Sequence, residues 1–451
     1  MNILMLTNTY KPLVGGLERS VEAFSREFRK LGHRVIIVAP EFEDMQPDPD
    51  VIRIPAIQNF NGSDFSVQLP IPGVLPDALG DFKPDIVHAH HPFLIGDTAL
   101  RIAYKNNVPL IYTYHTAFEY NLHYVPIKES TLKKFVIELS TGYANLADHV
   151  FAPSESIKAI LQERGVTTPI DVIPTGIDLK SFSHGKGQAF RRKHGIPLRA
   201  FVVGYVGRLA PEKNLEFLAT AVARFIQKVP QAVYMVAGKG PSEAILREIF
   251  SREKVEKNLF LVGTVTGTNL SDCYHAMDVF AFALQSETQG LVLAEAMACR
   301  VPVVAVDAAG VREVVKDEKN GRLLSVESMD DFVAALEWIH SIPDERRREI
   351  QRACRQTASE FAMNKIVKKV GQVYFSLILK DFVRRPSENS VWENTLRLIK
   401  AQWDLTRNLT KATGTMLLPE SAPEPSIIVE PEKNKGPANP TWHSRLVQIF
   451  Y

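Results

Sequence analysis

The chain has 451 residues, of which 45% are hydrophobic and 23% are charged, and its formal net charge is +2. A chain of this length is longer than a single hydrophobic core usually organises, so we expect two domains. The near-neutral net charge excludes a global electrostatic attraction to nucleic acid. The three cysteines have no Cys-x-x-Cys spacing, which indicates reduced core thiols in a cytosolic protein.

The N-terminal segment predicts a parallel βαβ unit. It lacks a basic signal-peptide start, and no apolar run in the chain is long enough to span a membrane, so we expect neither export nor a membrane span. Residues 2–7 and 33–39 have strand patterns, and residues 17–32 have helical spacing. Gly15 and Gly16 precede the helix, where a diphosphate could approach backbone amides without meeting a Cβ atom. A tight turn that requires glycine is the alternative.

The next segment, residues 40–80, is rich in proline and aspartate. Asp48 and Asp50 have the spacing of a metal-binding Asp-x-Asp motif. No strand pattern precedes them to fix the two carboxylates, so we predict no metal site.

Histidines gather at the ends of the two following strands. His88, His90 and His91 end one strand pattern, and His115 ends the next. Because ligands bind at the carboxyl ends of parallel strands, we expect all four to point toward one crevice. Their spacing matches no standard zinc pattern. His115 is the candidate functional residue, and a histidine packed among aromatic neighbours is the alternative.

Residues 119–150 are first aromatic and then amphipathic. Lys128, Lys133 and Lys134 lie close to an apolar stretch. This pattern is usual for the surface of a helix, and it also suits contact with an anionic lipid surface.

The second half of the chain repeats the order of the first. A polar, glycine-containing joint at residues 182–198 marks the change of domain, and a strand, loop, helix and strand follow. A crevice between two such domains is the expected ligand site. Arg208 and Lys213 lie in the loop after the first of these strands, where two cations suit a diphosphate. Two solvated surface cations are the alternative.

A turn, a helix and a buried strand are predicted around Glu287 and Glu295. The amides of Gly290, Leu291 and Val292 lie at the start of this helix, where partial positive charge suits an anion. The two carboxylates could accept hydrogen bonds from hydroxyl groups. The combination fits a phosphorylated sugar, and a buried structural unit with two incidental glutamates is the alternative.

Four sequence features together resemble those of the family 4 glycosyltransferases, which have the GT-B fold. They are the Gly15-Gly16 pair, the two cations in GRLAPEKN, the two glutamates separated by seven residues, and the sequence IPTGID. The similarity covers roughly residues 1–380. Residues 114–124 and 286–298 are similar to members that glucosylate diacylglycerol. Lys239 departs from the family, which commonly has an acidic residue there.

The resemblance implies an α/β fold with two Rossmann-like parallel-sheet domains, an interdomain cleft and a C-terminal helical tail. Residues 1–181 would bind the acceptor and residues 182–360 the nucleotide sugar. Residues 361–385 would form a helix crossing back to the first domain. Residues 386–451, helical and then rich in proline and glutamate, have no counterpart and no assigned role.

The resemblance also implies roles for individual residues. Arg208 and Lys213 would neutralise the leaving diphosphate, Glu287 would hold hydroxyls of the transferred sugar, and His115 would line the sugar and acceptor side. The remaining residues would bind the donor. Glu295 would bind the ribose, and five residues would face the phosphates: Gly15, Gly16, Gly290, Leu291 and Val292.

The expected activity is the retaining transfer of a hexose, by family default glucose from UDP-glucose, to a lipid acceptor such as 1,2-diacylglycerol. Neither a metal nor another cofactor is expected. The same chemistry on a soluble sugar or polyol is one alternative, and a non-catalytic nucleotide-sugar-binding scaffold is another. The expected partners are the nucleotide sugar and a lipid or membrane surface, without nucleic acid, at the cytoplasmic face of the cell membrane. The oligomeric state is not predicted.

Overall fold

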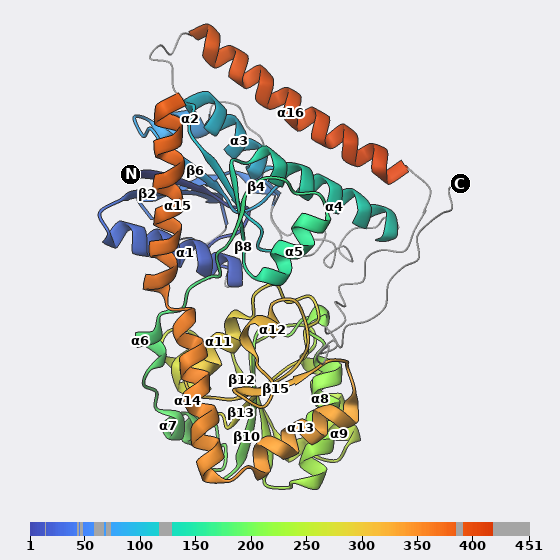
Figure 1. Cartoon of the computed structure of the whole chain (residues 1–451). Helices are drawn as coiled ribbons and strands as arrows, with labels where there is room; N and C mark the ends of the chain where they lie inside the picture. The colour runs from blue at the N-terminus through green and yellow to red at the C-terminus, as the bar shows by residue number, and fades with distance from the viewer. Residues whose placement is uncertain are drawn as a thin grey trace, which may run out of the picture. The chain divides into compact units, whose positions relative to one another are not determined.

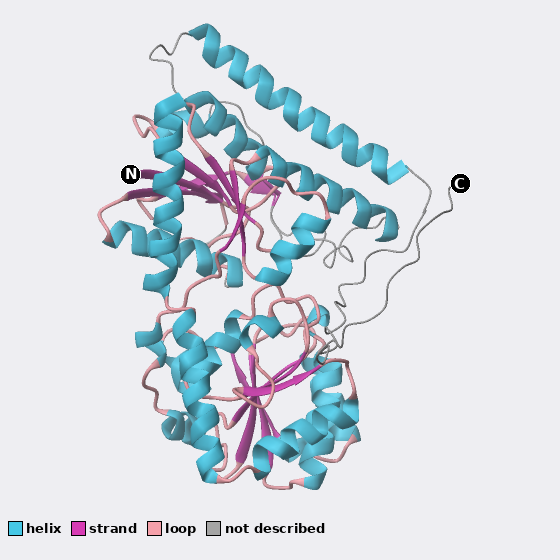
Figure 2. Cartoon of the chain, viewed as in Figure 1, coloured by secondary structure: helices cyan, strands magenta, loops and turns pink. Residues whose placement is uncertain are grey.

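Two parallel β-sheets with helices on their faces form the framework of the chain (Figures 1 and 2). We describe it from a computed structural model. The described residues are 1–13, 15–42, 45, 48–57, 67–68, 74–116, 129–384 and 391–417.

The first sheet has seven strands in the order β3-β2-β1-β6-β7-β8-β9, and all its pairings are parallel. Its strands are β1 (Asn2–Leu6), β2 (Arg34–Pro40), β3 (Val51–Ile54), β6 (Ile86–Ala89), β7 (Leu110–Thr113), β8 (His149–Ala152) and β9 (Ile170–Val172). The helices of this region are α1 (Gly16–Lys30), α2 (Val74–Leu79), α3 (Ile95–Asn106), α4 (Glu129–Leu146) and α5 (Glu155–Glu163). Two short strands, β4 (Ala56–Ile57) and β5 (Val67–Gln68), form a separate antiparallel pair. The predicted N-terminal βαβ unit is therefore confirmed.

The second sheet has six strands in the order β12-β11-β10-β13-β14-β15, again parallel throughout. Its strands are β10 (Phe201–Val206), β11 (Ala232–Ala237), β12 (Leu259–Gly263), β13 (Val279–Phe282), β14 (Val303–Val306) and β15 (Gly321–Leu324). The helices are α6 (Leu179–Phe182), α7 (Gly187–Lys193), α8 (Leu215–Lys228), α9 (Glu243–Arg252), α10 (Thr268–His275), α11 (Leu291–Ala298), α12 (Val311–Val314), α13 (Met329–Ser341) and α14 (Asp344–Glu360). Two 3-10 turns, Pro211–Lys213 and Glu256–Asn258, complete it.

Each sheet is covered on both faces, which explains the continuous apolar runs of its strands. All six residues of β10 and all six of β11 are buried. A distinct hydrophobic cluster lies on each face of the second sheet, and two further clusters lie around the first. These apolar runs are the sequence pattern from which we predicted buried parallel strands.

The segment expected to be a polar joint, residues 182–198, is instead partly helical and packed. Phe182, Phe190 and Ile196 are buried in a cluster of the second sheet. Gly187 also lies close to α10, because a Cβ atom there would come 2.1 Å from the carbonyl oxygen of His275. A few spaced apolar residues thus anchor a segment whose average composition is polar. The division of the chain into domains at residue 182 stays a prediction.

Helix α15 (Met363–Arg384) follows the second sheet in sequence but packs against α1 and the first sheet. The Tyr374 ring stacks on the Phe28 ring with centroids 5.3 Å apart. Its hydroxyl lies 2.6 Å from His88 Nδ1 in β6. Residues far apart in the chain therefore complete one core.

Helix α16 (Val391–Leu417) lies along α3 and α4 (Figure 1). The sequence predicted only a weaker helical pattern here, and the structure shows a helix of 27 residues. Gly142 of α4 allows the close approach, because a Cβ atom there would lie 1.7 Å from Asn408 Oδ1. One side of α4, which we considered as a lipid-facing surface, is thus covered by protein. Lys128 lies outside the described residues.

We expect Gly142→Ala to lower the free energy of unfolding by about 1–3 kcal/mol, because the added methyl group overpacks the contact with Asn408. Gly414→Ala is the matched control, since a Cβ atom at Gly414 meets nothing within 4 Å. Alanine favours a helix over glycine, so the control should be neutral or stabilise by up to about 1 kcal/mol. Urea unfolding measures both, and equal effects would contradict the packing argument.

Within the part of the chain that the structure describes, no helix is both long enough and apolar enough to cross a bilayer.

Candidate functional site

The turn before α11 is held by the carboxylate of Glu287. Glu287 Oε1 accepts hydrogen bonds from the amides of Gln289, at 3.1 Å, and Gly290, at 3.0 Å. Gly290 has φ of 74°, a left-handed conformation that favours glycine, and a Cβ atom there would lie 3.0 Å from the Gly310 carbonyl oxygen. The amide of Gly290, which the sequence analysis expected to face a phosphate, therefore donates to Glu287 instead.

The next two amides of α11, those of Leu291 and Val292, have no acceptor among the described residues. They are the first two N–H groups of the helix, and such groups have no partner inside it. These two N–H groups give the N-terminus of α11 a site of hydrogen-bond donors with partial positive charge. An anion at this position would be bound by Leu291 and Val292, without the amide of Gly290.

Glu295 is buried, and each of its carboxylate oxygens accepts one hydrogen bond from another side chain. Its Oε1 accepts a hydrogen bond from Arg19 Nη1 at 2.8 Å, and its Oε2 accepts one from the Tyr274 hydroxyl at 2.8 Å. Burial raises the pKa of Glu295, while Arg19 and Tyr274 oppose that rise. Because each carboxylate oxygen has two acceptor sites, Glu295 retains capacity for a further donor.

Arg19 lies on α1, one turn after Gly15 and Gly16, so the ion pair connects the glycine loop to α11. Gly15 is the residue that precedes α1, and a Cβ atom there would come 2.4 Å from Glu18 Oε2. A Cβ atom at Gly16 would meet nothing within 4 Å. The Glu18 carboxylate therefore lies beside the position where we predicted a phosphate.

Arg208 and Lys213 follow β10 as predicted. Arg208 is exposed, and its Nη2 donates to Glu212 Oε1 at 2.9 Å. Lys213 ends the 3-10 turn, and its ammonium group has no ion-pair partner within the described ranges. An exposed ion pair is worth only about 0–1 kcal/mol, so Arg208 can exchange Glu212 for a phosphate at small cost.

Tyr205 connects the loop of Arg208 with the turn of Glu287. Its hydroxyl donates to the Arg208 carbonyl oxygen at 3.2 Å. Burial raises the pKa of Tyr205, and the negative charges of Glu212 and Glu287 raise it further. Both carboxylates therefore lie within electrostatic range of the same phenol.

His115 is joined to the Glu287 turn through Thr288. Thr288 Oγ1 donates to the His115 carbonyl oxygen at 2.9 Å, and Ser154 Oγ donates to the Thr288 carbonyl oxygen at 2.9 Å. Gln289 exchanges two hydrogen bonds with the backbone of Thr175, each of 2.9 Å. The turn before α11 is thus bonded at three points to residues that follow strands of the first sheet.

The rings of His88, His90 and His115 contact one another, whereas His91 has a different partner. His115 Nε2 lies 2.9 Å from His90 Nδ1, and the His88 and His90 rings are 4.1 Å apart. His88 is held by Thr113 and Tyr374, and His91 Nδ1 accepts from the Asn8 amide at 3.0 Å. Of the four histidines, His90 and His115 therefore remain as the candidates for a functional pair.

Acid is expected to destabilise the fold through these histidines. Burial lowers the pKa of His88, His91 and His115 to about 3, and it also lowers the pKa of His90 well below its ordinary value. In the unfolded chain they bind protons below about pH 6.5, so stability is present above that pH and is lost as the pH falls toward 3. Each of these histidines adds about 1.4 kcal/mol per pH unit to the slope of the free energy of unfolding against pH. Urea unfolding between about pH 6.5 and 5 measures the slope, and His115→Gln should remove one such contribution.

No group of three or more His, Cys, Asp or Glu side chains in the described ranges is arranged to hold a metal ion. Asp48 Oδ1 accepts a hydrogen bond from the Asp50 amide at 3.1 Å, and Asp50 pairs with Arg29. Asp48 is thus used within its own loop, and Asp50 is used by Arg29 of α1.

The structure places several of the predicted residues in separate hydrogen-bonded groups, whose other members the sequence analysis missed. Arg19 and Tyr274 hold Glu295, Thr288 holds His115, and Tyr205 holds the Arg208 loop. Arg19 could have been found from its place one turn after the glycine pair. Tyr274 has no local sequence signal, since it lies on a different helix.

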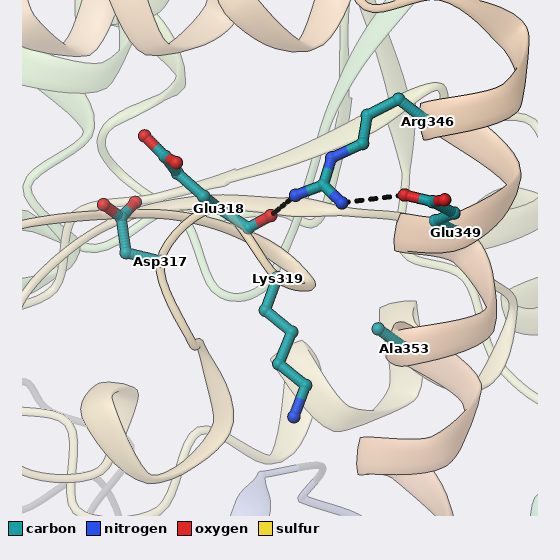
Figure 3. Close-up of a pocket in the computed structure, with 6 residues that line it drawn as sticks. All are labelled: Asp317, Glu318, Lys319, Arg346, Glu349 and Ala353. Atoms are coloured by element: carbon teal, nitrogen blue, oxygen red, sulfur yellow. Dashed lines mark hydrogen bonds and ion pairs between the residues drawn. The ribbon is translucent and has the colours of Figure 1, made fainter.

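A surface hollow of about 340 Å³ lies elsewhere, between the turn at residues 317–319 and α14 (Figure 3). Arg346 crosses it, donating to the Glu318 carbonyl oxygen and to the Glu349 carboxylate, both at 2.8 Å. It contains none of the predicted site residues. We therefore assign no role to it.

Comparison with solved structures identifies the fold. Sucrose-phosphate synthase from Thermosynechococcus elongatus superposes with a TM-score of 0.67 at 20% identity, covering 84% of this chain and 99% of that one. HepE from Anabaena, solved in complex with UDP-glucose, superposes with a TM-score of 0.66 at 20% identity, covering 84% and 100%. The two-sheet architecture is thus the GT-B fold, as predicted.

Two family models match most of the chain. Residues 14–181 match Glycosyltransferase Family 4, and residues 187–357 match Glycosyl transferases group 1. The chain belongs to the family 4 glycosyltransferases, and it is a hexosyltransferase by family.

Curated relatives transfer different sugars. Alpha-monoglucosyldiacylglycerol synthase of Acholeplasma laidlawii is 29% identical over 335 residues, which is 71% of this chain and 84% of the relative. GDP-mannose-dependent alpha-mannosyltransferase of Corynebacterium glutamicum is 26% identical over 392 residues, covering 84% and 89%. The family thus fixes a nucleotide-sugar donor, whereas the names of these relatives differ in the transferred sugar.

Proposed function

We propose that the protein transfers glucose from UDP-glucose, with retention of configuration, to a lipid acceptor, 1,2-diacylglycerol, at the cytoplasmic face of the cell membrane. The observation that supports the donor site is the turn of Glu287, which leaves the amides of Leu291 and Val292 at the start of α11 without an acceptor among the described residues. UDP-glucose is bound by the HepE structure, and the acceptor is taken from the Acholeplasma relative.

In this proposal the diphosphate lies against Leu291, Val292, Arg208 and Lys213. The two amides donate hydrogen bonds, Arg208 exchanges Glu212 for phosphate oxygens, and Lys213 acts as a point charge. Breaking the sugar–diphosphate bond places negative charge on the leaving oxygens, and preorganised cations and dipoles stabilise it. Glu295 accepts a ribose hydroxyl at its remaining acceptor sites.

Glu287 and His115 act on the sugar. Glu287 Oε1 is used by two amides, so its second oxygen is the one that accepts hydroxyls of the transferred hexose. The His115 carbonyl oxygen is held by Thr288, which positions the histidine next to the same turn. The glycine loop of Gly15 and Gly16 closes the phosphate side.

A screen of products separates the alternatives. The chain is incubated with a panel of nucleotide sugars and either a lipid extract or a pool of sugars and polyols, and mass spectrometry reads the products. Glucosylated diacylglycerol from UDP-glucose supports the proposal. Product only in the soluble pool would favour a sugar or polyol acceptor, and donor binding without product in both would favour a non-catalytic scaffold.

We expect a chelator to leave turnover unchanged, because Arg208 and Lys213 supply the positive charge that a metal supplies elsewhere. Turnover is measured with and without excess EDTA, and with Mg²⁺ restored. A loss of activity on chelation that Mg²⁺ reverses would contradict the metal-free proposal.

A further inference from the structure

Helix α16 has large exposed apolar side chains in addition to its buried ones. Against α3 and α4, Asp404 Oδ2 accepts from the Tyr104 hydroxyl at 3.2 Å, and Asn408 Nδ2 donates to the Leu139 carbonyl oxygen at 3.1 Å. Ala401, Leu405 and Ala412 are buried as well, whereas Ile399 is 59% exposed and Trp403 is 68% exposed. Such exposure of large apolar groups departs from the polar outer side of a helix that faces only water.

The exposed apolar area continues along the helix and is bordered by cations. Ile399, Trp403 and Arg407 are spaced four residues apart, so they lie one above another on a helix. Leu409 is also exposed, and Lys400, which is exposed although its ammonium group lies 5.8 Å from the centroid of the Tyr104 ring of α3, lies three residues before Trp403. We call this surface, made of Leu398, Ile399, Lys400, Trp403, Arg407 and Leu409, the outer face of α16.

The charge of the outer face is positive. The side chain of Arg407 is 68% exposed even though it pairs with Asp404, and Asp404 itself is buried. From residue 397 to residue 414, where the structure describes exposure, no carboxylate on α16 is exposed. The face therefore presents an indole and aliphatic groups beside cations, and nothing on it repels an anion.

We propose that the outer face of α16 binds the surface of a bilayer that contains anionic lipid. The helix would lie in the plane of the interface, with Trp403 and Ile399 among the headgroups and Lys400 and Arg407 on lipid phosphates. A second copy of the chain fits less well, because a symmetric contact of two such faces would bring their cations together. The proposal concerns attachment, and it holds whichever acceptor the enzyme uses.

Vesicle binding by the full chain tests this surface. We expect the chain to sediment with mixed phosphatidylcholine and phosphatidylglycerol vesicles, less at high salt, and weakly with phosphatidylcholine alone. Ile399→Glu with Trp403→Glu should weaken binding at least tenfold. Lys400→Gln and Arg407→Gln should each cost about fivefold, which corresponds to about 1 kcal/mol per cation. Leu198→Glu, an exposed apolar residue near β10, is the matched control and should bind normally.

Fluorescence provides a second reading that does not depend on folding of the glutamate variants. The difference between the wild-type chain and Trp403→Phe isolates the emission of Trp403, which should shift to shorter wavelength and become shielded from iodide only with mixed vesicles. Equal vesicle binding by the double variant, or no binding by the wild type, would overturn the proposal. Shielding of Trp403 without vesicles would also overturn it, and the mass in solution would then show whether a second copy covers the face. None of these readings uses turnover, so failure of the proposed glucosyl transfer would not be mistaken for failure here.

Discussion

Replacing Arg208 or Lys213 with alanine is expected to lower turnover at least about a hundredfold while the chain stays folded. The reason is that loss of one group that stabilises developing charge costs on the order of 3 kcal/mol in the transition state. The fold should persist, because Arg208 is exposed and its ion pair with Glu212 contributes about 0–1 kcal/mol. Steady-state kinetics with the donor and thermal unfolding measure the two effects separately.

Arg224→Ala is the control for this loss of charge. Arg224 is a half-exposed cation on α8 of the same sheet, and its nearest carboxylate, on Asp330, is 3.9 Å away. Turnover of this variant should equal that of the wild type. If Arg208→Ala and Lys213→Ala also turned over normally, neither residue would act on the diphosphate.

Glu287 is expected to show two separable roles. Glu287→Ala leaves the amides of Gln289 and Gly290 without their acceptor, so it should lower stability by about 1–3 kcal/mol and turnover at least about a hundredfold. Glu287→Gln keeps one acceptor oxygen for the amides, so its stability should stay close to the wild type. Its turnover should still fall, because a carboxylate accepts hydroxyl hydrogen bonds more strongly than an amide does.

The glutamine variant decides between the two roles. Both variants are compared by thermal unfolding and by kcat with saturating donor. Normal turnover in Glu287→Gln would reduce Glu287 to a residue that shapes the turn, and the sugar would then need another acceptor of hydrogen bonds.

The sequence predicted the elements whose pattern is local. The strands β10 and β11 are unbroken apolar runs between turn residues, and α1 has its apolar side chains at helical spacing. The turn of Glu287 was also visible, because its carboxylate and the helix that it precedes are adjacent in the chain. For these elements a few neighbouring residues contain the physical cause.

Contacts between distant segments could not be predicted in the same way. The ion pair of Arg19 with Glu295 joins residues 276 positions apart, and neither residue has a neighbour that indicates the other. The joint at residues 182–198 looked polar on average, although Phe182 and Phe190 anchor it in a core. The placement of α16 depends on Gly142, a single missing side chain on another helix.

The stacking of Tyr374 on Phe28 has a consequence for synthesis on the ribosome. The first sheet emerges early, but the helix that covers Phe28 and bonds His88 is made only after the entire second sheet. Nascent chains should therefore expose an uncovered apolar groove beside α1 until translation passes residue 384, and during that interval they should be substrates for chaperones that recognise such surfaces.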